Sequence, residues 1–272
     1  MDVDAYRAYS CSMSAHPSAV GDLLRHWRQR RHLSQLDLAV EVEVSTRHLS
    51  FMETGRAVPS RQMLLRVAER LEVPLRERNK LLLAAGYAPM FSEHGLEADA
   101  MSTVREAIQR VLSAHEPYPA LAVDGHWHLL DANRAVAPLM AGAAPWLLAS
   151  KINVLRLSLH PEGIASQIEN LGEWRAHVLH RLQRQCEQTG DPFLATLYDE
   201  LAGYPVPVEA TTADHAAGAI AVPLRLRTPA GVLSFLSATM VFGTPRDVTL
   251  SEIAIETFLP ADALTAAALA AV

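Results

Sequence analysis

The sequence has little cysteine, few aromatic residues and no long apolar run. Cys11 and Cys186 are the only two cysteines among 272 residues. Neither a disulfide framework nor a thiolate zinc site is therefore expected, and a reducing cytoplasm is favoured. No apolar run reaches the roughly 20 residues that a membrane-spanning helix needs. The first 19 residues lack a basic stretch followed by an apolar core, so no signal peptide is expected. We therefore expect a cytoplasmic protein with no membrane partner.

The motifs that carry common enzyme chemistry are also missing. The sequence contains no G-x-S-x-G, no H-E-x-x-H, no phosphate-binding P-loop and no dinucleotide-binding glycine pattern. Carboxylates in the second half are scattered in a way typical of solvated helix faces: Glu169, Glu173, Asp191, Asp199 and Glu200. We therefore predict no catalytic residues and no cofactor.

Charge is divided unevenly along the chain, whose net charge is −6. Residues 1–89 carry 13 Lys and Arg against 10 Asp and Glu, whereas the remainder carries 11 against 20. A basic first third on an acidic body favours an anionic partner at one end of the protein. Many solvated helices have a similar excess of one charge, so this asymmetry is weak evidence by itself.

Residues 34–56 have the pattern of two short helices separated by a tight turn. Ser34 and Asp37 form an S-x-x-D capping box, which predicts a helix that begins near Gln35. Ser45 is the expected N-cap of the second helix, which Gly55 ends. Amphipathic patterns predict three more helices, at residues 19–31, 62–71 and 74–86. The sequence thus predicts a helix-turn-helix domain of five helices over residues 18–88.

The second helix of such a pair lies in the DNA major groove, with its first side chains at the base edges. Arg47 can donate two hydrogen bonds to a guanine, and Phe51 can touch a thymine methyl group. Gln35 is expected at a backbone phosphate. The predicted DNA-binding residues are Gln35, Ser45, Thr46, Arg47, His48, Ser50, Phe51 and Arg56. A helical protein-interaction module with the same fold is the alternative.

The stretch LSQLDLAVEVEVSTRHLSFMETGRAVPS resembles the xenobiotic-response-element (XRE) type of helix-turn-helix, a lambda-repressor-like class. The matching positions are Ser34-Gln35, Leu38-Ala39, Val44-Ser45, Glu53-x-Gly55-Arg56 and Pro59-Ser60. The sequence departs from this class at the turn, where Glu43 stands in place of the usual glycine. We expect Glu43 in a left-handed conformation, at a cost of about 1 kcal/mol.

After an expected linker at residues 89–101, the chain changes character. Two apolar runs flank Asp124-Gly125, which predicts a two-residue type I′ hairpin. Helices are expected between Leu155 and Arg184 and from Pro192, and strands on either side of Pro229-Ala230-Gly231 and after Val248. The last alanine-rich residues are expected to fray. Residues 102–265 therefore predict an α+β, PAS-like domain with its helices on one face of a sheet.

A second resemblance covers most of the chain, from Ala19 to Ala263. The segments RHLSFMETGR, LRERNKLLLAAGYAP, HEPYPALAVD, WHLLDAN, NVLRLSLHPEG, NLGEW, TGDP and FGTPRDVTLSEIAIETFLPAD occur in the expected order. Together they resemble regulators with a MmyB-like ligand-binding domain. The resemblance implies a bacterial transcription regulator whose second domain binds a small molecule, with a fatty-acid-like effector as one option.

Four residues of the second domain are candidates for a ligand pocket: Trp127, Asn133, Arg156 and Trp174. Each has a structural alternative, since the tryptophans can be core residues, Arg156 can form an ion pair, and Asn133 is more expected to cap a helix. Arg225 is a further candidate for a ligand carboxylate. The pairs His126/His128 and His177/His180 lack a carboxylate or cysteine at fitting spacing, so no metal is predicted.

The sequence therefore predicts a sequence-specific DNA-binding transcription regulator whose second domain senses a ligand, dimerises, or both. One helix-turn-helix buries little surface, so we expect a homodimer on an inverted-repeat operator with half-sites about 34 Å apart or a multiple of that distance. A protein-interaction adaptor, and an enzyme tethered to DNA, are the two rival classes.

Overall fold

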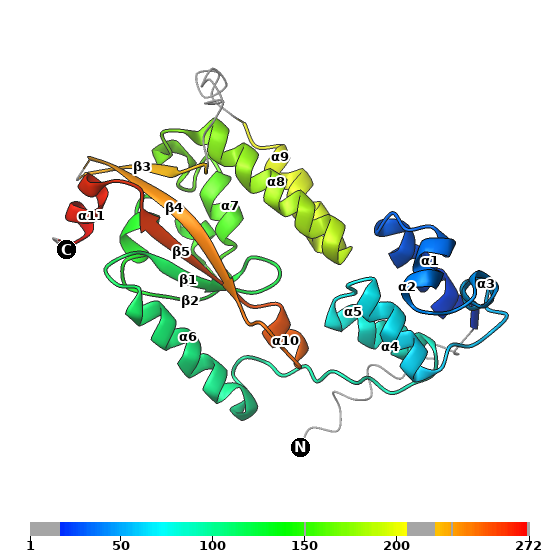
Figure 1. Cartoon of the computed structure of the whole chain (residues 1–272). Helices are drawn as coiled ribbons and strands as arrows, with labels where there is room; N and C mark the ends of the chain where they lie inside the picture. Colours follow the sequence, from blue (N-terminus) through cyan, green and yellow to red (C-terminus); the bar gives the residue numbers. More distant parts are fainter. Residues whose placement is uncertain (1–16, 150, 206–220, 230, 271–272) are drawn as a thin grey trace. The chain divides into compact units, whose positions relative to one another are not determined.

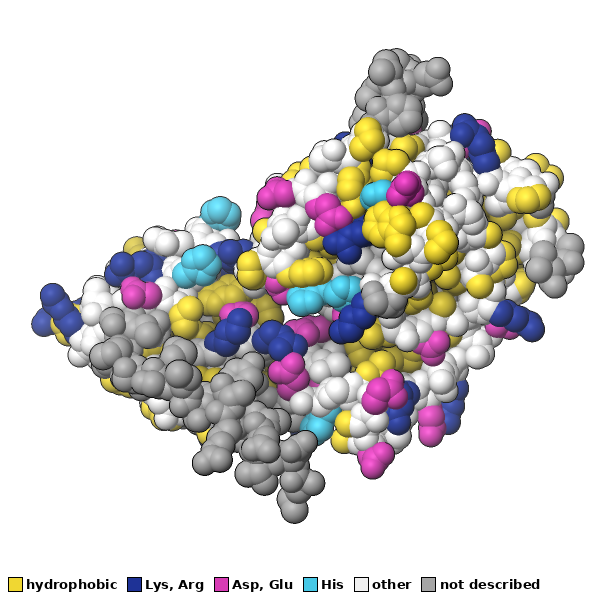
Figure 2. All heavy atoms as spheres, turned by 180° about the vertical axis from the view of Figure 1, so that it is seen from behind, with side chains coloured by type: hydrophobic (Ala, Val, Ile, Leu, Met, Phe, Trp, Pro, Cys, Tyr) yellow, Lys and Arg dark blue, Asp and Glu magenta, His cyan; other side chains and the backbone are white. Residues whose placement is uncertain are grey.

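The computed structural model describes residues 17–149, 151–205, 221–229 and 231–270. The chain divides into two compact units (Figure 1). The first unit holds the chain up to Glu93 together with Arg246–Val248, and the second holds His94–Pro245 and Thr249–Val272. Each unit has its own hydrophobic core and is described by itself. On the face drawn in Figure 2, several Lys and Arg side chains lie on the first unit, and apolar side chains cover much of the second.

The described part of the first unit is built from five helices, which confirms the predicted helix-turn-helix domain. They are α1 Pro17–Arg30, α2 Gln35–Glu41, α3 Thr46–Glu53, α4 Arg61–Arg70 and α5 Leu75–Ala84. Their inward faces form one core in which Leu24, Leu38, Leu49, Met52 and Leu64 are almost completely buried.

The helices begin where the sequence places capping residues. The side chain of Ser34 accepts a hydrogen bond from the Asp37 backbone N–H and completes the predicted capping box of α2. Ser45 caps α3 by accepting from the His48 N–H. Glu43, in the turn between α2 and α3, has φ 57°, so the expected left-handed conformation is confirmed. These local hydrogen bonds fix the angle at which α3 leaves the turn.

The start of the predicted linker is tied to α5. The Asn79 side chain accepts from the backbone N–H groups of Met90 and Phe91 and donates to the Phe91 carbonyl at 2.7 Å. The end of the linker forms a short 3-10 helix, η1 Asp99–Met101, that leads directly into α6 Ser102–Ala114. The described linker residues are therefore partly ordered by contacts that their composition does not predict.

The second unit contains a five-stranded antiparallel sheet, which confirms the α+β prediction. The strands are β1 Ala120–Val123, β2 Leu129–Ala132, β3 Leu224–Thr228, β4 Gly231–Val241 and β5 Ala254–Pro260. Their order across the sheet is β2-β1-β5-β4-β3. β4 and β5 share the longest register, from Phe235 opposite Pro260 to Val241 opposite Ala254. The predicted strand before Pro229 lies partly outside the described residues.

Helices cover both faces of this sheet, so the prediction that they gather on one face is wrong (Figure 1). Successive side chains of a strand point to opposite faces. Leu121 and Val123 enter the large core with the longer helices, whereas Ala120 and Ala122 meet Ile108 and other apolar residues of α6. The remaining helices and 3-10 helices are η2 Ala137–Met140, η3 Pro145–Leu147, α7 Val154–Leu159, η4 Ala165–Gln167, α8 Leu171–Thr189, α9 Pro192–Ala202, α10 Val248–Ser251 and α11 Ala263–Ala270. None of the helices within the described residues is long and apolar enough to cross a membrane.

The loop between β1 and β2 is longer than the predicted type I′ turn. Five residues separate the strands, and Trp127 has φ 67°. The side chain of Asp124 accepts from the backbone N–H groups of His126 and His128, both at 2.9 Å. The two-residue turn is therefore wrong: the chain turns over Asp124–Trp127, where the Trp127 N–H donates to the Asp124 carbonyl and the Asp124 N–H donates to the His128 carbonyl, both at 3.0 Å.

The segment from Leu155 to Arg184 is mainly helical, as predicted, but the chain turns sharply between α7 and α8 at Gly163, where an added Cβ would lie 2.1 Å from the Leu157 carbonyl oxygen. One further prediction about the second unit is wrong. The alanine-rich segment up to residue 270 does not fray, since α11 begins with Thr265 N–H donating to the Asp262 carboxylate at 2.7 Å. The hydroxyl of Thr265 then accepts from the Ser234 N–H on β4.

Candidate DNA-binding surface and ligand cavity

The first turns of α3 present polar side chains on the side opposite the core. Leu49 and Met52 are fully buried and anchor the helix. Arg47 and His48 in the first turn are exposed, and Thr46 is half-buried beside them. The N-cap Ser45 is exposed and Ser50 is half-buried. The predicted contact residues of this helix thus lie on one accessible face, as insertion into a major groove requires.

Phe51 holds two arginines next to that face. The guanidinium carbons of Arg47 and Arg56 lie 5.2 Å and 5.9 Å from the centroid of its ring, within the range of a cation–π contact. The backbone carbonyl of Phe51 also accepts from the N–H groups of Arg56 and Ala57, at 2.8 Å and 3.0 Å. Gly55, with φ 72°, turns the chain so that the Arg56 and Ala57 N–H groups can reach the Phe51 carbonyl. Arg47 and Arg56, nine positions apart, are thereby brought together over one ring.

Gln35 lies in a different environment from the one predicted. Its side-chain amide donates to the buried carboxylate of Glu53 at 2.8 Å. Arg28 donates to both oxygens of the same carboxylate, at 2.6 Å and 2.9 Å. Burial disfavours ionisation of Glu53, but the hydrogen bonds from Arg28 and Gln35 outweigh it and hold its pKa below the ordinary value. One amide hydrogen of Gln35 is therefore donated to Glu53 inside the domain. The second amide hydrogen can be donated to a DNA phosphate.

The second unit contains an apolar cavity of about 110 Å³ between the sheet and the helices α7 and α8. Trp127 and Trp174, both predicted as pocket residues, line it. The described residues on its wall are Pro119, Leu121, Trp127, Leu129, Val136, Leu139, Met140, Val154, Leu155, Leu157, Ser158, Ile164, Trp174, His177, Val178, Arg181, Leu224, Leu226, Ser237, Glu256 and Phe258. Such a lining, apolar with a few polar groups, is typical of small-molecule sites.

A charged cluster stands on the wall of this cavity. Arg181 of α8 donates to both carboxylate oxygens of Glu256 on β5, at 2.5 Å and 3.0 Å. Its guanidinium lies 4.7 Å from the Trp127 ring and donates to the Thr239 hydroxyl at 2.6 Å. A wider groove of about 540 Å³ shares Trp127, His177 and Arg181 with the cavity. The cluster therefore lies where the cavity meets the groove.

Asn133 and Arg156, the other two predicted pocket residues, do not line the cavity. The Asn133 side chain accepts from Ala120 N–H and donates to the carbonyls of Leu112 and Tyr118, so it does not cap the helix that follows it. Arg156 forms a two-bond ion pair with Glu200, at 2.6 Å and 2.7 Å. Both side chains are thus engaged by other groups of the protein. Arg225 is exposed on β3.

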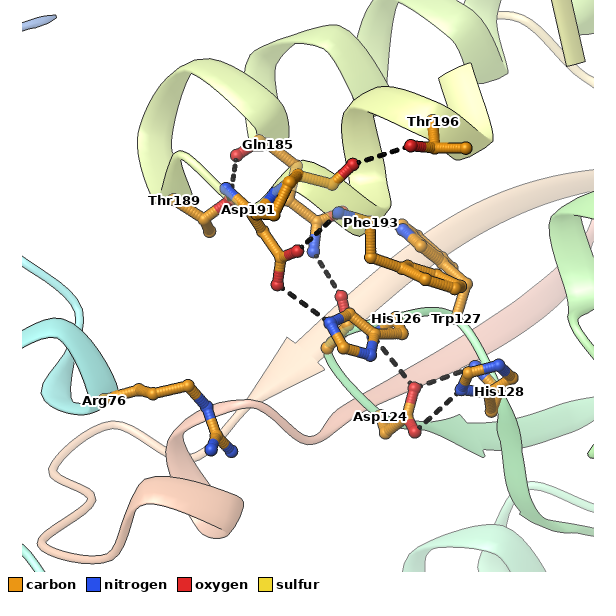
Figure 3. Close-up of polar contacts among 12 residues, drawn as sticks. Arg76, Asp124, His126, Trp127, His128, Gln185, Thr189, Asp191, Phe193 and Thr196 are labelled. Carbon is orange, nitrogen blue, oxygen red and sulfur yellow. Dashed lines mark hydrogen bonds and ion pairs between the residues drawn. The ribbon is translucent and has the colours of Figure 1, made fainter. Parts of the chain in front are cut away.

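The histidines of the β1–β2 loop hold the loop in place (Figure 3). His126 Nε2 lies 2.8 Å from an Asp191 oxygen, and His128 Nδ1 lies 3.1 Å from Asp124. Trp127 donates from its indole N–H to Gln185 of α8 at 2.7 Å. Among the residues that the structure describes, no group of three potential metal ligands comes together. The loop is thus fastened to α8 and to the start of α9 by side chains.

The candidate site residues that the sequence did not predict are the charged pair on the cavity wall. Arg181 and Glu256 are 75 positions apart, and only the fold brings them together. One signal was present: Glu256 interrupts the otherwise apolar or neutral run IAIETFLP, which is unusual for a central strand.

Comparisons with known proteins follow this division into two units. Residues 19–81 match a family described as a helix-turn-helix domain. Two solved structures of the clp gene regulator ClgR from Corynebacterium glutamicum are similar. One is 28% identical, covering 26% of this chain and 87% of that chain, with a TM-score of 0.23. The other is 26% identical, covering 37% and 94%, also with a TM-score of 0.23. No curated protein matches.

A second family model, which matches the second unit, shows the family of the chain. Residues 104–272, more than half of the chain, match the family described as the MmyB-like transcription regulator ligand binding domain. This agrees with the resemblance seen in the sequence and with the helix-turn-helix unit that precedes the domain. The chain belongs to the MmyB-like transcription regulators, with an XRE-type helix-turn-helix domain followed by a MmyB-like ligand-binding domain.

Proposed function

We propose that the protein binds a specific operator sequence as a homodimer and responds to a small apolar effector. The observation that carries the DNA-binding half is the exposed face of α3, where Arg47 and Arg56 are held by Phe51. Arg47 reads a guanine, Arg56 meets the backbone, and Thr46 and Ser50 contact neighbouring bases or phosphates. His48 and Ser45 lie at the margin of this surface, and Gln35 contacts a phosphate beside it.

The effector site is the cavity of the second unit. Its wall of leucines, valines and aromatic rings suits an apolar body such as the chain of a fatty-acid-like molecule. An engineered cavity of 150 Å³ in another protein holds benzene, so 110 Å³ has room for a short apolar segment, with the rest in the groove. The sheet order β2-β1-β5-β4-β3 and the helices packed on it support the PAS-like sensor architecture.

The regulator acts in a bacterial cytoplasm and has no enzymatic step. Neither rival class has a specific observation in its favour. An adaptor without a DNA role predicts no salt-dependent binding to any duplex, whereas a domain that grips phosphates loses affinity steeply with salt.

The DNA-binding proposal is tested by selecting duplexes from a random pool with the purified full chain. We expect enrichment of an inverted repeat, and fluorescence anisotropy on the selected duplex should give a log–log salt slope near −0.9 for each phosphate contact. Failure to enrich any sequence, with a salt-independent signal, would contradict the proposal.

Oligomeric state and effector are tested together by native mass spectrometry without added ligand. A dimer carrying a co-purified small molecule is the expected species. A monomer both alone and on the selected duplex would refute the homodimer, whatever the occupancy of the cavity.

A further inference from the structure

The cavity wall is electrically neutral although it carries two charged side chains. Of the described residues that line it, only Arg181 and Glu256 are charged near neutral pH. They form a two-bond ion pair, and the Glu256 side chain is 5% exposed. Each charge therefore has its counterion inside the protein before any ligand arrives.

Thr239 forms a hydrogen bond with each member of the pair. The Thr239 hydroxyl donates to Glu256 Oε1 at 3.0 Å, on the same oxygen that accepts from Arg181 Nη2. The guanidinium lies against the Trp127 ring. A new anion can gain the full attraction of Arg181 only if Glu256 gives it up, which would leave a buried carboxylate unpaired.

The third titratable group on the wall does not supply a positive charge. Burial lowers the pKa of His177, and the neighbouring Arg181 lowers it further. His177 stacks on Trp174 at 5.5 Å between ring centroids. A neutral imidazole offers a hydrogen-bond donor and an acceptor, but no counterion.

By contrast, the cavity wall offers hydrogen-bonding partners for uncharged polar groups of a ligand. Ser158 accepts from the Trp174 indole N–H at 2.9 Å, so its own hydroxyl hydrogen can be donated elsewhere. Ser237 of β4 also lines the cavity. A hydroxyl or ester oxygen of a ligand can meet these groups without separating the ion pair.

We propose that the cavity selects an uncharged apolar molecule, such as an alcohol or ester, over the carboxylate of the same chain, and that Glu256 determines this preference by occupying Arg181. This inference rests on the proposed effector role of the cavity and refines the fatty-acid-like ligand to one with an uncharged head. A carboxylate with an ordinary pKa near 4.3 must be protonated to bind here, which at pH 7 reduces its apparent affinity by roughly 500-fold.

The experiment compares 1-hexanol with hexanoate at pH 7 by isothermal calorimetry on the full chain. We expect 1-hexanol to bind at least about tenfold more tightly, since part of this roughly 500-fold penalty is relieved if the carboxylate reaches the groove. Equal binding, or tighter binding of hexanoate, overturns the inference and leaves the effector site standing. Binding of neither compound overturns both, while the DNA-binding proposal is tested separately by duplex selection.

Variants test whether Glu256 causes the preference for the uncharged ligand. Glu256→Gln keeps the shape and releases Arg181, so hexanoate should gain at least about tenfold and the preference should vanish. Glu200→Gln is the matched control, because Glu200 forms an equivalent ion pair with Arg156 away from the cavity. It should leave the preference unchanged. If Glu256→Gln does not fold, the paired change Arg181→Met with Glu256→Leu should retain the alcohol preference, and tighter hexanoate binding in that variant would overturn the inference.

Discussion

Phe51 offers the sharpest test of the DNA-binding surface. Its ring contacts the guanidinium groups of Arg47 and Arg56, at 5.2 Å and 5.9 Å. Replacing it by leucine keeps an apolar side chain on α3 and removes the π face. An exposed cation–π contact is worth ~0.5–1 kcal/mol, so the two contacts together contribute ~1–2 kcal/mol to holding the arginines in place. That corresponds to roughly a 5- to 30-fold increase in the Kd for operator DNA.

Fluorescence anisotropy on the selected operator measures the change, and Phe51→Tyr is the matched control because it retains the aromatic face. We expect Tyr to bind like the wild type and Leu to bind weakly, with similar melting temperatures for both. A double-mutant cycle with Arg56→Ala separates positioning from direct contact. If Phe51→Leu binds as tightly as the wild type, or if the two changes are strictly additive, the positioning role is refuted.

Three more outcomes follow from the two units. Arg47→Ala should cost about 1–3 kcal/mol of operator affinity and relax specificity at one base pair, which binding to single-base operator variants will show. Because Glu53 has a lowered pKa in the folded state, its contribution to stability is complete above its unfolded pKa and is lost as pH falls through the folded value. Melting temperature against pH should therefore fall on the acid side, and Glu53→Gln should flatten that fall. Asn133→Ala removes three hydrogen bonds to backbone groups and should destabilise the second unit by about 3 kcal/mol in denaturant unfolding, without changing the operator affinity of the folded protein.

The helix-turn-helix unit could be predicted closely because its signals are local. Ser34 and Ser45 each bind a backbone N–H three positions ahead, and Glu43 reaches its left-handed conformation within the turn itself. Such contacts are visible in a short window of sequence. The Arg28–Glu53 pair, 25 positions apart, was not predicted, and it explains why the amide of Gln35 is directed into the domain.

The second unit was predicted less well because some local side-chain contacts were overlooked and others join residues that are distant in sequence. Asp124-Gly125 predicted a two-residue turn, but the chain turns over Asp124–Trp127, and the Asp124 side chain accepts from the N–H groups of His126 and His128. The alanine-rich end was predicted to fray, but Asp262 caps α11 and Thr265 anchors the helix to β4. The cap was visible in the sequence, since Asp262 precedes Thr265 by three positions, but the anchor was not.

Trp127 connects the cavity to the rest of the second unit. The same residue lines the cavity, lies against Arg181 and donates to Gln185, and it occupies a left-handed backbone conformation that costs about 1 kcal/mol or more. Because its surroundings hold it there, a ligand that displaces the ring acts at once on the β1–β2 loop and on α8. Such a ligand changes operator affinity only by as much as it distinguishes two states of this unit. Operator DNA must then change the affinity for the ligand by the same factor, so calorimetry with and without duplex measures the coupling directly. Equal affinities in both titrations would show that the cavity and the DNA-binding surface act independently.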